Sequence, residues 1–122
     1  VKVVWKDVAA ARFPTPSINA HVAARCAQRQ GAFWEYHDGL FANQEFLNEA
    51  TYFDLAAQLE LNESKFEKCY RDQAVKPLVD EGTNLANALG IEGTPFFVIG
   101  NEQFSGARTK EFIQRAVAKT RN

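Results

Sequence analysis

Two short apolar runs on either side of a long helical block constrain the fold of this chain more than any other feature. Residues 1–5 (Val-Lys-Val-Val-Trp) are β-branched and aromatic, which is typical of a strand buried on both faces. Residues 96–99 (Phe-Phe-Val-Ile) form a second such run, and a turn at 100–102 separates it from a short return strand at 103–106. This order predicts a mixed sheet with helices packed against it.

Apolar residues spaced three or four apart fill the stretch between the two runs. Ile18, Val22 and Cys26 recur four residues apart and predict one helical stripe, with Ser17 as its N-cap and Gly31 just past its end. The same reasoning predicts the other helices at 32–44, at 48–59, from the N-cap Asn62 onward, at about 74–89 with Gly90 after it, and at 109–119.

Size and charge narrow the class of protein. A chain of 122 residues makes one domain, and 14 basic against 15 acidic residues leave a net charge of −1. That balance favours neither nucleic acid nor a membrane surface as a partner. No apolar run approaches the roughly 20 residues that span a bilayer, and the first residues carry no signal-peptide pattern.

The two cysteines, Cys26 and Cys69, are too few for a disulfide scaffold of a small secreted module. From the residues alone they are either two buried thiols or a redox couple, and their place inside apolar helical stripes disfavours catalysis. With His21 and His37 they could in principle bind zinc, but the spacing matches no short metal-binding pattern, so we expect no metal or other cofactor. The aromatic residues between positions 33 and 53 are interpreted as core rather than as a ligand groove.

Residues 93–100 (Gly-Thr-Pro-Phe-Phe-Val-Ile-Gly) and 104–107 (Phe-Ser-Gly-Ala) resemble the cis-proline loop and terminal hairpin of the thioredoxin superfamily. The likeness is closest to the bacterial DsbA-like disulfide oxidoreductases, and it extends over most of the chain. Further similar stretches lie at residues 1–7, 23–27, 31–41, 66–69 and 89–95.

The resemblance implies an α/β thioredoxin-like fold in the order β-α(insertion)-α-β-β-α, as a single domain over 1–122 with a helical insertion at about 17–73. It implies that the Thr94-Pro95 bond is cis and that these two residues hold an extended peptide or protein substrate. It also implies a structural disulfide between Cys26 and Cys69, with Cα atoms within about 7 Å. A periplasmic or other extracytoplasmic location fits the family.

One departure changes the functional expectation. Family members carry a strand and then a Cys-x-x-Cys motif ahead of the strand matched here by residues 1–5, and this chain begins after that unit with no Cys-x-x-Cys anywhere. The chemistry needs a first thiol with a lowered pKa and a second thiol that resolves the mixed disulfide. We therefore expect a redox-inactive relative of protein thiol–disulfide oxidoreductases. The alternative is a non-enzymatic peptide-binding or assembly module that keeps the cis-proline loop.

The expected sheet also bears on oligomeric state. Without the preceding strand, both Val1–Trp5 and Phe96–Ile99 would present unpaired edges, and such edges template association. A homodimer that pairs edges or exchanges Val1–Trp5 is the expected result.

Overall fold

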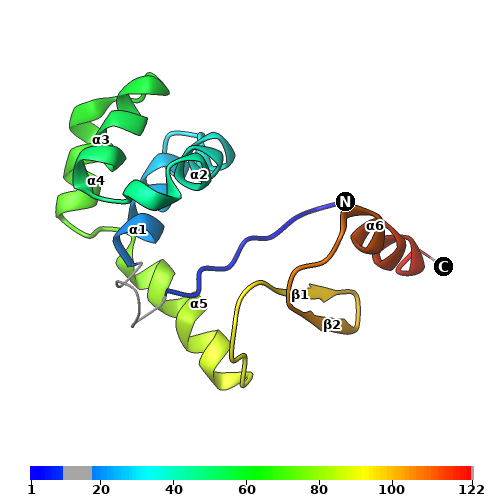
Figure 1. Cartoon of the computed structure of the whole chain (residues 1–122). Coiled ribbons are helices and arrows are strands. Elements are labelled where there is room, and N and C mark those ends of the chain that lie inside the picture. Colours follow the sequence, from blue (N-terminus) through cyan, green and yellow to red (C-terminus); the bar gives the residue numbers. More distant parts are fainter. Residues whose placement is uncertain (10–17, 122) are drawn as a thin grey trace. The chain divides into compact units, whose positions relative to one another are not determined.

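The structure, a computed structural model, describes residues 1–9 and 18–121, which divide into two compact units. The helical unit comprises Asp7–Thr83, and the hairpin unit comprises Val1–Lys6 together with Asn84–Asn122 (Figure 1). The elements in chain order are α1 (Ile18–Gln28), α2 (Phe33–Ala42), the 3₁₀ turn η1 (Gln44–Phe46), α3 (Glu49–Gln58), α4 (Glu63–Arg71), α5 (Lys76–Ala88), β1 (Phe96–Ile99), β2 (Glu102–Ser105) and α6 (Lys110–Lys119).

Side-chain caps and glycines set most helix ends. The Asn62 side chain accepts a hydrogen bond from the Lys65 backbone N–H at 3.0 Å, as the sequence predicts. Thr109 caps α6 in the same way through the Phe112 N–H. Gly31 follows α1 with a φ of 77°, a left-handed conformation that favours glycine. The predicted cap Ser17 and most of the connector before it lie outside the described residues.

The helical unit has a closely packed core in which α1 contacts α2, α3 and α4. Its largest fully buried side chains are those of Tyr36, Phe66, Val22, Val79 and Cys26. The Tyr36 hydroxyl donates a hydrogen bond to the Tyr52 carbonyl at 2.8 Å, and burial raises the pKa of this hydroxyl far above its ordinary value. The Tyr36 side chain therefore stays a proton donor, which satisfies the one polar atom that it brings into the core.

The aromatic residues expected in the core divide into two groups. Phe33, Tyr36 and Tyr52 are buried, as expected for an insertion core. Trp34 and Phe41 are exposed on α2 and belong to its surface.

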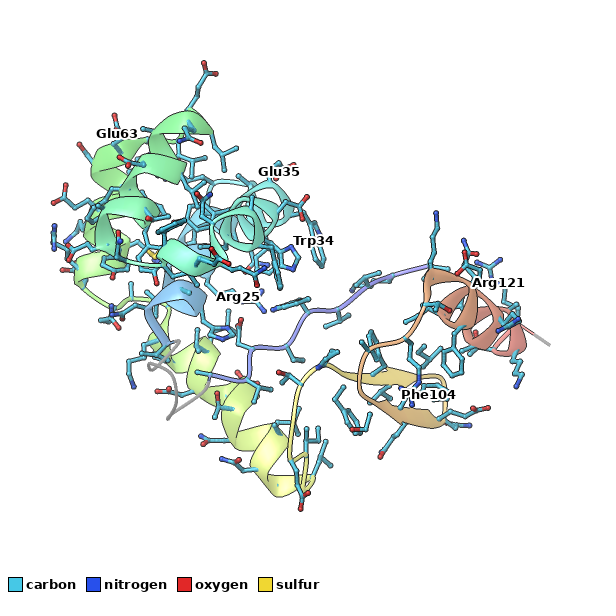
Figure 2. The ribbon with its side chains drawn as sticks, in the orientation of Figure 1. Arg25, Trp34, Glu35, Glu63, Phe104 and Arg121 are labelled. Atoms are coloured by element: carbon cyan, nitrogen blue, oxygen red, sulfur yellow. A yellow bond between two sulfur atoms is a disulfide. The ribbon has the colours of Figure 1, made fainter. Side chains whose placement is uncertain are left out.

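The hairpin unit is built on a two-stranded antiparallel sheet. Phe96 lies opposite Ser105 and Ile99 opposite Glu102, so Gly100 and Asn101 form a two-residue turn. The return strand therefore begins one residue earlier than the predicted 103–106, because Glu102 pairs with Ile99 instead of lying in the turn. Helix α6 packs on one face of the sheet, where the ring centroids of Phe104 and Phe112 are 4.9 Å apart (Figure 2).

Residues 1–9 form no strand, which differs from the strand expected at residues 1–5. Val1 is 85% exposed, and Val3 and Val4 are also exposed. A strand is stable only when a neighbour supplies hydrogen-bond partners for its backbone, and in the described part of the chain β1 and β2 pair only with each other. The strand propensity of residues 1–5 is therefore not sufficient to form a strand without such a neighbour. Among the helices of residues 18–121, none is long and apolar enough to cross a membrane.

Candidate functional site

The loop ahead of β1 brings together the two residues expected to bind substrate. The Thr94-Pro95 peptide bond is cis, and both residues are exposed. The Pro95 carbonyl accepts a hydrogen bond from the Gly106 N–H at 2.9 Å, which extends the hairpin by one residue pair. Within residues 1–9 and 18–121, no hydrogen bond engages the Thr94 backbone. The loop is therefore anchored on its β2 side and open on the other.

The hydrogen-bonding pattern of the hairpin identifies which backbone groups point away from β2. In an antiparallel pair, hydrogen-bonded residue pairs alternate with non-hydrogen-bonded pairs. Because Pro95 and Gly106 form a hydrogen-bonded pair, Phe97 and Ile99 also direct their N–H and C=O groups toward β2. Phe96 and Val98 direct theirs to the opposite side, which we call the outer edge of β1. Thr94 lies outside β1, in a bend before the cis bond, and its backbone groups make no hydrogen bond within the described residues.

The two faces of the hairpin differ in what covers them. Phe97 and Phe104 share the face against α6, since residues opposite each other on paired strands lie on the same side. Phe96 and Val98 lie on the opposite face, where Val98 is 62% exposed. The outer edge of β1 therefore adjoins one open apolar face and one face lined by α6.

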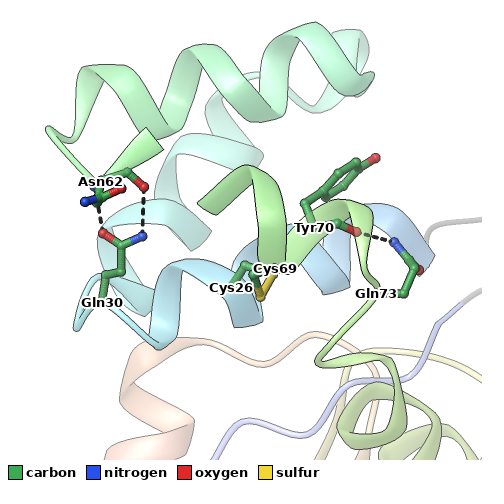
Figure 3. The surroundings of a disulfide bond; sticks show 6 residues. All are labelled: Cys26, Gln30, Asn62, Cys69, Tyr70 and Gln73. Carbon is green, nitrogen blue, oxygen red and sulfur yellow. Dashed lines mark hydrogen bonds between the residues drawn. A yellow bond between two sulfur atoms is a disulfide. The ribbon is translucent and has the colours of Figure 1, made fainter. Parts of the chain in front are cut away.

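Cys26 and Cys69 form the disulfide implied by the family resemblance, with Cα atoms 5.8 Å apart. It joins α1 to α4 inside the helical unit, where the two residues are only 1% and 8% exposed. Beside it, Gln30 and Asn62 exchange two hydrogen bonds at 3.2 and 2.7 Å (Figure 3). The bridge is a buried clamp between helices, and it leaves the chain without a thiol.

A buried carboxylate, which the sequence did not indicate, fixes the start of the helical unit. Asp7 is 2% exposed, and its two oxygens lie 2.7 Å from Arg25 Nε and 2.9 Å from His21 Nδ1. Burial alone raises the pKa of the Asp7 carboxyl, but the hydrogen bonds from His21 and Arg25 and the charge of Arg25 outweigh it, so the pKa is lower than usual. Asp7 is held as a carboxylate and serves as an anchor.

The histidines are engaged by carboxylates. His21 contacts Asp7, and His37 Nδ1 lies 3.0 Å from Asp38 Oδ1 on α2, beside the rings of Trp34 and Phe41. Across the described ranges, no group of three or more histidine, cysteine or acidic side chains is placed to hold a metal ion.

Comparison with known protein families identifies the family of this chain. The DSBA-like thioredoxin domain matches residues 7–118. The chain belongs to this family. Its architecture of mostly helices with a small antiparallel sheet agrees with a DsbA-like thioredoxin-fold domain.

Two curated relatives match almost the whole chain. They are the proteins named Na(+)/H(+) antiporter NhaA 3 of Salinispora tropica and Na(+)/H(+) antiporter NhaA 1 of Salinispora arenicola, each 29% identical over 117 residues. The match covers 96% of this chain but 18% of each relative, so the chain spans less than a fifth of their length. No solved structure matches the chain.

Sequence reasoning missed three residues that the structure brings into view: Asp7, Arg25 and Arg108. Arg25 stands in the otherwise apolar segment next to Cys26, and a charged residue in such a stripe signals a buried partner. Asp7 and Arg108 lie in segments whose local sequence predicts no buried ion pair or ring contact. Neither position carries a local signal, because their contacts depend on how distant segments meet.

Proposed function

We propose that this DSBA-like domain binds extended polypeptide along the outer edge of β1, beginning at the Thr94-Pro95 loop, and that its own cysteines take no part in thiol–disulfide exchange. The observation that carries the proposal is the outward direction of the Phe96 and Val98 backbone groups, next to the unbonded backbone of Thr94. An exposed sheet edge of this kind accepts an added strand through main-chain hydrogen bonds, and side-chain contacts then give specificity.

The outer edge of β1 is better suited to this role than the free edge of β2. A peptide beside β1 would pack against the side chains of Phe96 and Val98 on the open face. A peptide beside β2 would meet Gln103 and Ser105 at the corresponding positions. Cross-strand pairs with aromatic and β-branched residues stabilise a sheet more than pairs with small polar residues.

The state of the two sulfur atoms supports the redox-inactive half of the proposal. Thiol–disulfide exchange begins with an accessible thiolate, and both cysteines of this chain are buried in the Cys26–Cys69 bridge. We expect insulin reduction by dithiothreitol to proceed at the background rate in the presence of this chain. Turnover that disappears in Cys26→Ser would contradict this half of the proposal.

Amide exchange measured by NMR tests the peptide-binding half. In the unbound chain, the Phe97 and Ile99 amides should exchange slowly because they bond to β2, while the Phe96 and Val98 amides exchange fast. A bound peptide should slow the Phe96 and Val98 amides and leave the other two unchanged. A peptide methylated on the backbone nitrogens that face β1 is the matched control and should not bind. Protection that appears elsewhere, or equally with the methylated peptide, would reject the proposal.

The relatives named as sodium/proton antiporters suggest where such a domain can work. Because the match covers only a small part of each relative, we infer that a domain of this kind can serve as an attached binding module of a larger protein. Ion transport itself is not assigned to these residues.

A homodimer remains a second proposal for the same edge. Val1, Val3 and Val4 are exposed and β-branched, so residues 1–5 of one copy could pair with the outer edge of β1 in another. Sedimentation equilibrium at micromolar concentration should then show a species of twice 13.7 kDa that a bound peptide dissociates. A single 13.7 kDa species at all concentrations would rule the dimer out.

A further inference from the structure

We propose that the peptide bound at the outer edge of β1 is acidic and that Arg108 selects it by pairing with a carboxylate. This inference rests on the proposed function and adds the class of ligand and the residue that recognises it. Three observations carry it: the charge of the hairpin unit, the position of Arg108, and the alternation of the two hairpin faces.

The net charge of −1 conceals an uneven distribution between the two units. The hairpin unit contains seven basic and three acidic residues, a formal charge of +4, whereas the helical unit contains seven basic and twelve acidic residues, a formal charge of −5. The proposed binding edge therefore belongs to the positive unit. A positive unit attracts an acidic ligand and repels a basic one, and both effects weaken as salt is added.

Arg108 is the basic residue closest in sequence to Gly106, which anchors the loop at Pro95. The Gly106 N–H bonds to the Pro95 carbonyl, and Arg108 Nη1 lies 3.5 Å from where a Cβ at Gly106 would stand. The guanidinium carbon lies 5.4 Å from the centroid of the Phe112 ring, and Nη1 donates to the Ala107 carbonyl at 3.3 Å. These contacts hold the side chain near the loop while leaving other N–H groups of the guanidinium to bind a ligand.

No carboxylate of the described chain neutralises Arg108. Every ion pair between described side chains lies within the helical unit. An arginine guanidinium offers a planar fork that matches a carboxylate in two parallel hydrogen bonds. The structure therefore provides a positioned cation with no carboxylate partner among the described residues.

The alternation of faces predicts a pattern in the ligand. Arg108 stacks on Phe112 and so lies on the α6 side of the hairpin. Arg108 follows β2, so a strand added at the outer edge of β1 would lie two strand spacings, about 10 Å, from its side of the hairpin. A glutamate on the α6 face of the added strand and the long Arg108 side chain could together span that distance. Residues on the other face of the added strand would lie beside Phe96 and Val98. The favoured ligand alternates acidic residues with apolar or β-branched residues.

The test uses the full 122-residue chain and three fluorescein-labelled heptapeptides. In the first peptide glutamate alternates with valine and threonine; in the second, glutamine replaces glutamate; in the third, lysine replaces it. Fluorescence anisotropy should give a dissociation constant about three- to tenfold lower for the glutamate peptide than for the glutamine peptide, the size expected of one partly exposed arginine–carboxylate pair. The lysine peptide should bind more weakly than the glutamine peptide, and raising salt should narrow all these differences.

Arg108→Gln is the diagnostic variant, and Arg115→Gln is its matched control. Both remove one positive charge from the same unit, and Arg115 is exposed on α6. Arg108→Gln should reduce binding of the glutamate peptide to the level of the glutamine peptide and leave the latter unchanged. Arg115→Gln should weaken binding of the glutamate peptide less than twofold, since it lowers only the net positive charge of the hairpin unit.

The outcomes separate the two proposals. If none of the three peptides binds, the peptide-binding function itself is wrong. If the glutamate and glutamine peptides bind equally, the edge binds peptide but the inference about acidic ligands is wrong. If the two arginine variants weaken glutamate binding equally, the charge of the unit favours acidic peptides and the assignment to Arg108 is wrong.

Discussion

Replacing Asp7 with asparagine should destabilise the helical unit more than any other single loss of charge. The Asp7 carboxylate is almost fully buried and contacts both Arg25 Nε at 2.7 Å and His21 Nδ1 at 2.9 Å. Asparagine keeps one acceptor oxygen but removes the negative charge of Asp7 from beside the buried Arg25 guanidinium. Breaking a buried pair in this way costs about 3–5 kcal/mol, because one charge remains buried and uncompensated.

A loss of that size is easily measured. For a chain of this length it corresponds to a fall in Tm of about 10–20 °C. Urea unfolding followed by the helical circular-dichroism signal should report the same loss at pH 7. The matched control is Asp72→Asn, which also removes an aspartate from an ion pair, in this case with Lys68 at 2.9 Å on the exposed surface of α4. We expect the control to change the free energy of unfolding by no more than about 1 kcal/mol.

A double-mutant cycle with Arg25→Gln completes the test. If Asp7 acts through Arg25, the double variant should be more stable than the sum of the two single losses predicts, by at least about 1 kcal/mol. Additive losses, or an Asp7→Asn variant no less stable than Asp72→Asn, would refute the assignment of Asp7 as an anchor.

Three further results are expected. The folded-state pKa of the Asp7 carboxyl is lowered, so its contribution to the free energy of unfolding is complete above the unfolded-state pKa of about 4 and is lost as pH falls through the lower folded-state pKa. Urea titrations from pH 7 downward should therefore show a narrowing difference in stability between the wild type and Asp7→Asn. The double variant Cys26→Ser/Cys69→Ser should lose about 4 kcal/mol by urea unfolding, since the bridge spans 43 positions, and a loss below about 1 kcal/mol would show that the clamp is not structural. Gly82→Ala should destabilise the helical unit in thermal unfolding, because a Cβ at this position would overlap the Asp7 carbonyl oxygen. The control Gly93→Ala should be nearly neutral, since no atom lies within 4 Å of a Cβ there, and equal effects of the two variants would contradict the close approach.

The helices were predictable from the sequence because their ends carry local signals. The Asn62 and Thr109 caps and the glycines after α1 and α5 mark boundaries within a few residues of those observed. The hairpin itself was also predicted, but its turn was placed at residues 100–102 and its return strand at 103–106, one residue later than β2. The register, which assigns Phe96 and Val98 to the outer edge, is known only once the two-residue turn is seen.

The remaining features depend on contacts between distant segments. Residues 1–5 have strand propensity, but pairing requires a neighbour that local sequence does not identify. The contact of Asp7 with Arg25 spans 18 positions, and that of the Asp7 backbone with Gly82 spans most of the helical unit. Total net charge was also uninformative, since the division into +4 and −5 emerges only when the two units are known.

The contact between Asp7 and Gly82 has a consequence for the order of folding. These residues lie at the two ends of the helical unit, where the chain enters it and leaves it, and the Ala9 N–H bonds to Thr83 Oγ1 at 3.0 Å at the same place. Once the helical unit has folded, residues 6 and 84 are therefore held near each other, so Val1–Lys6 and Asn84–Asn122 meet as though joined by a short loop. Replacing an open loop of about 75 residues with one of a few residues lowers the entropic cost of closure by about 2–3 kcal/mol. Folding of the helical unit thus prepares the hairpin unit to assemble, and the reverse order would have to close the long loop unaided.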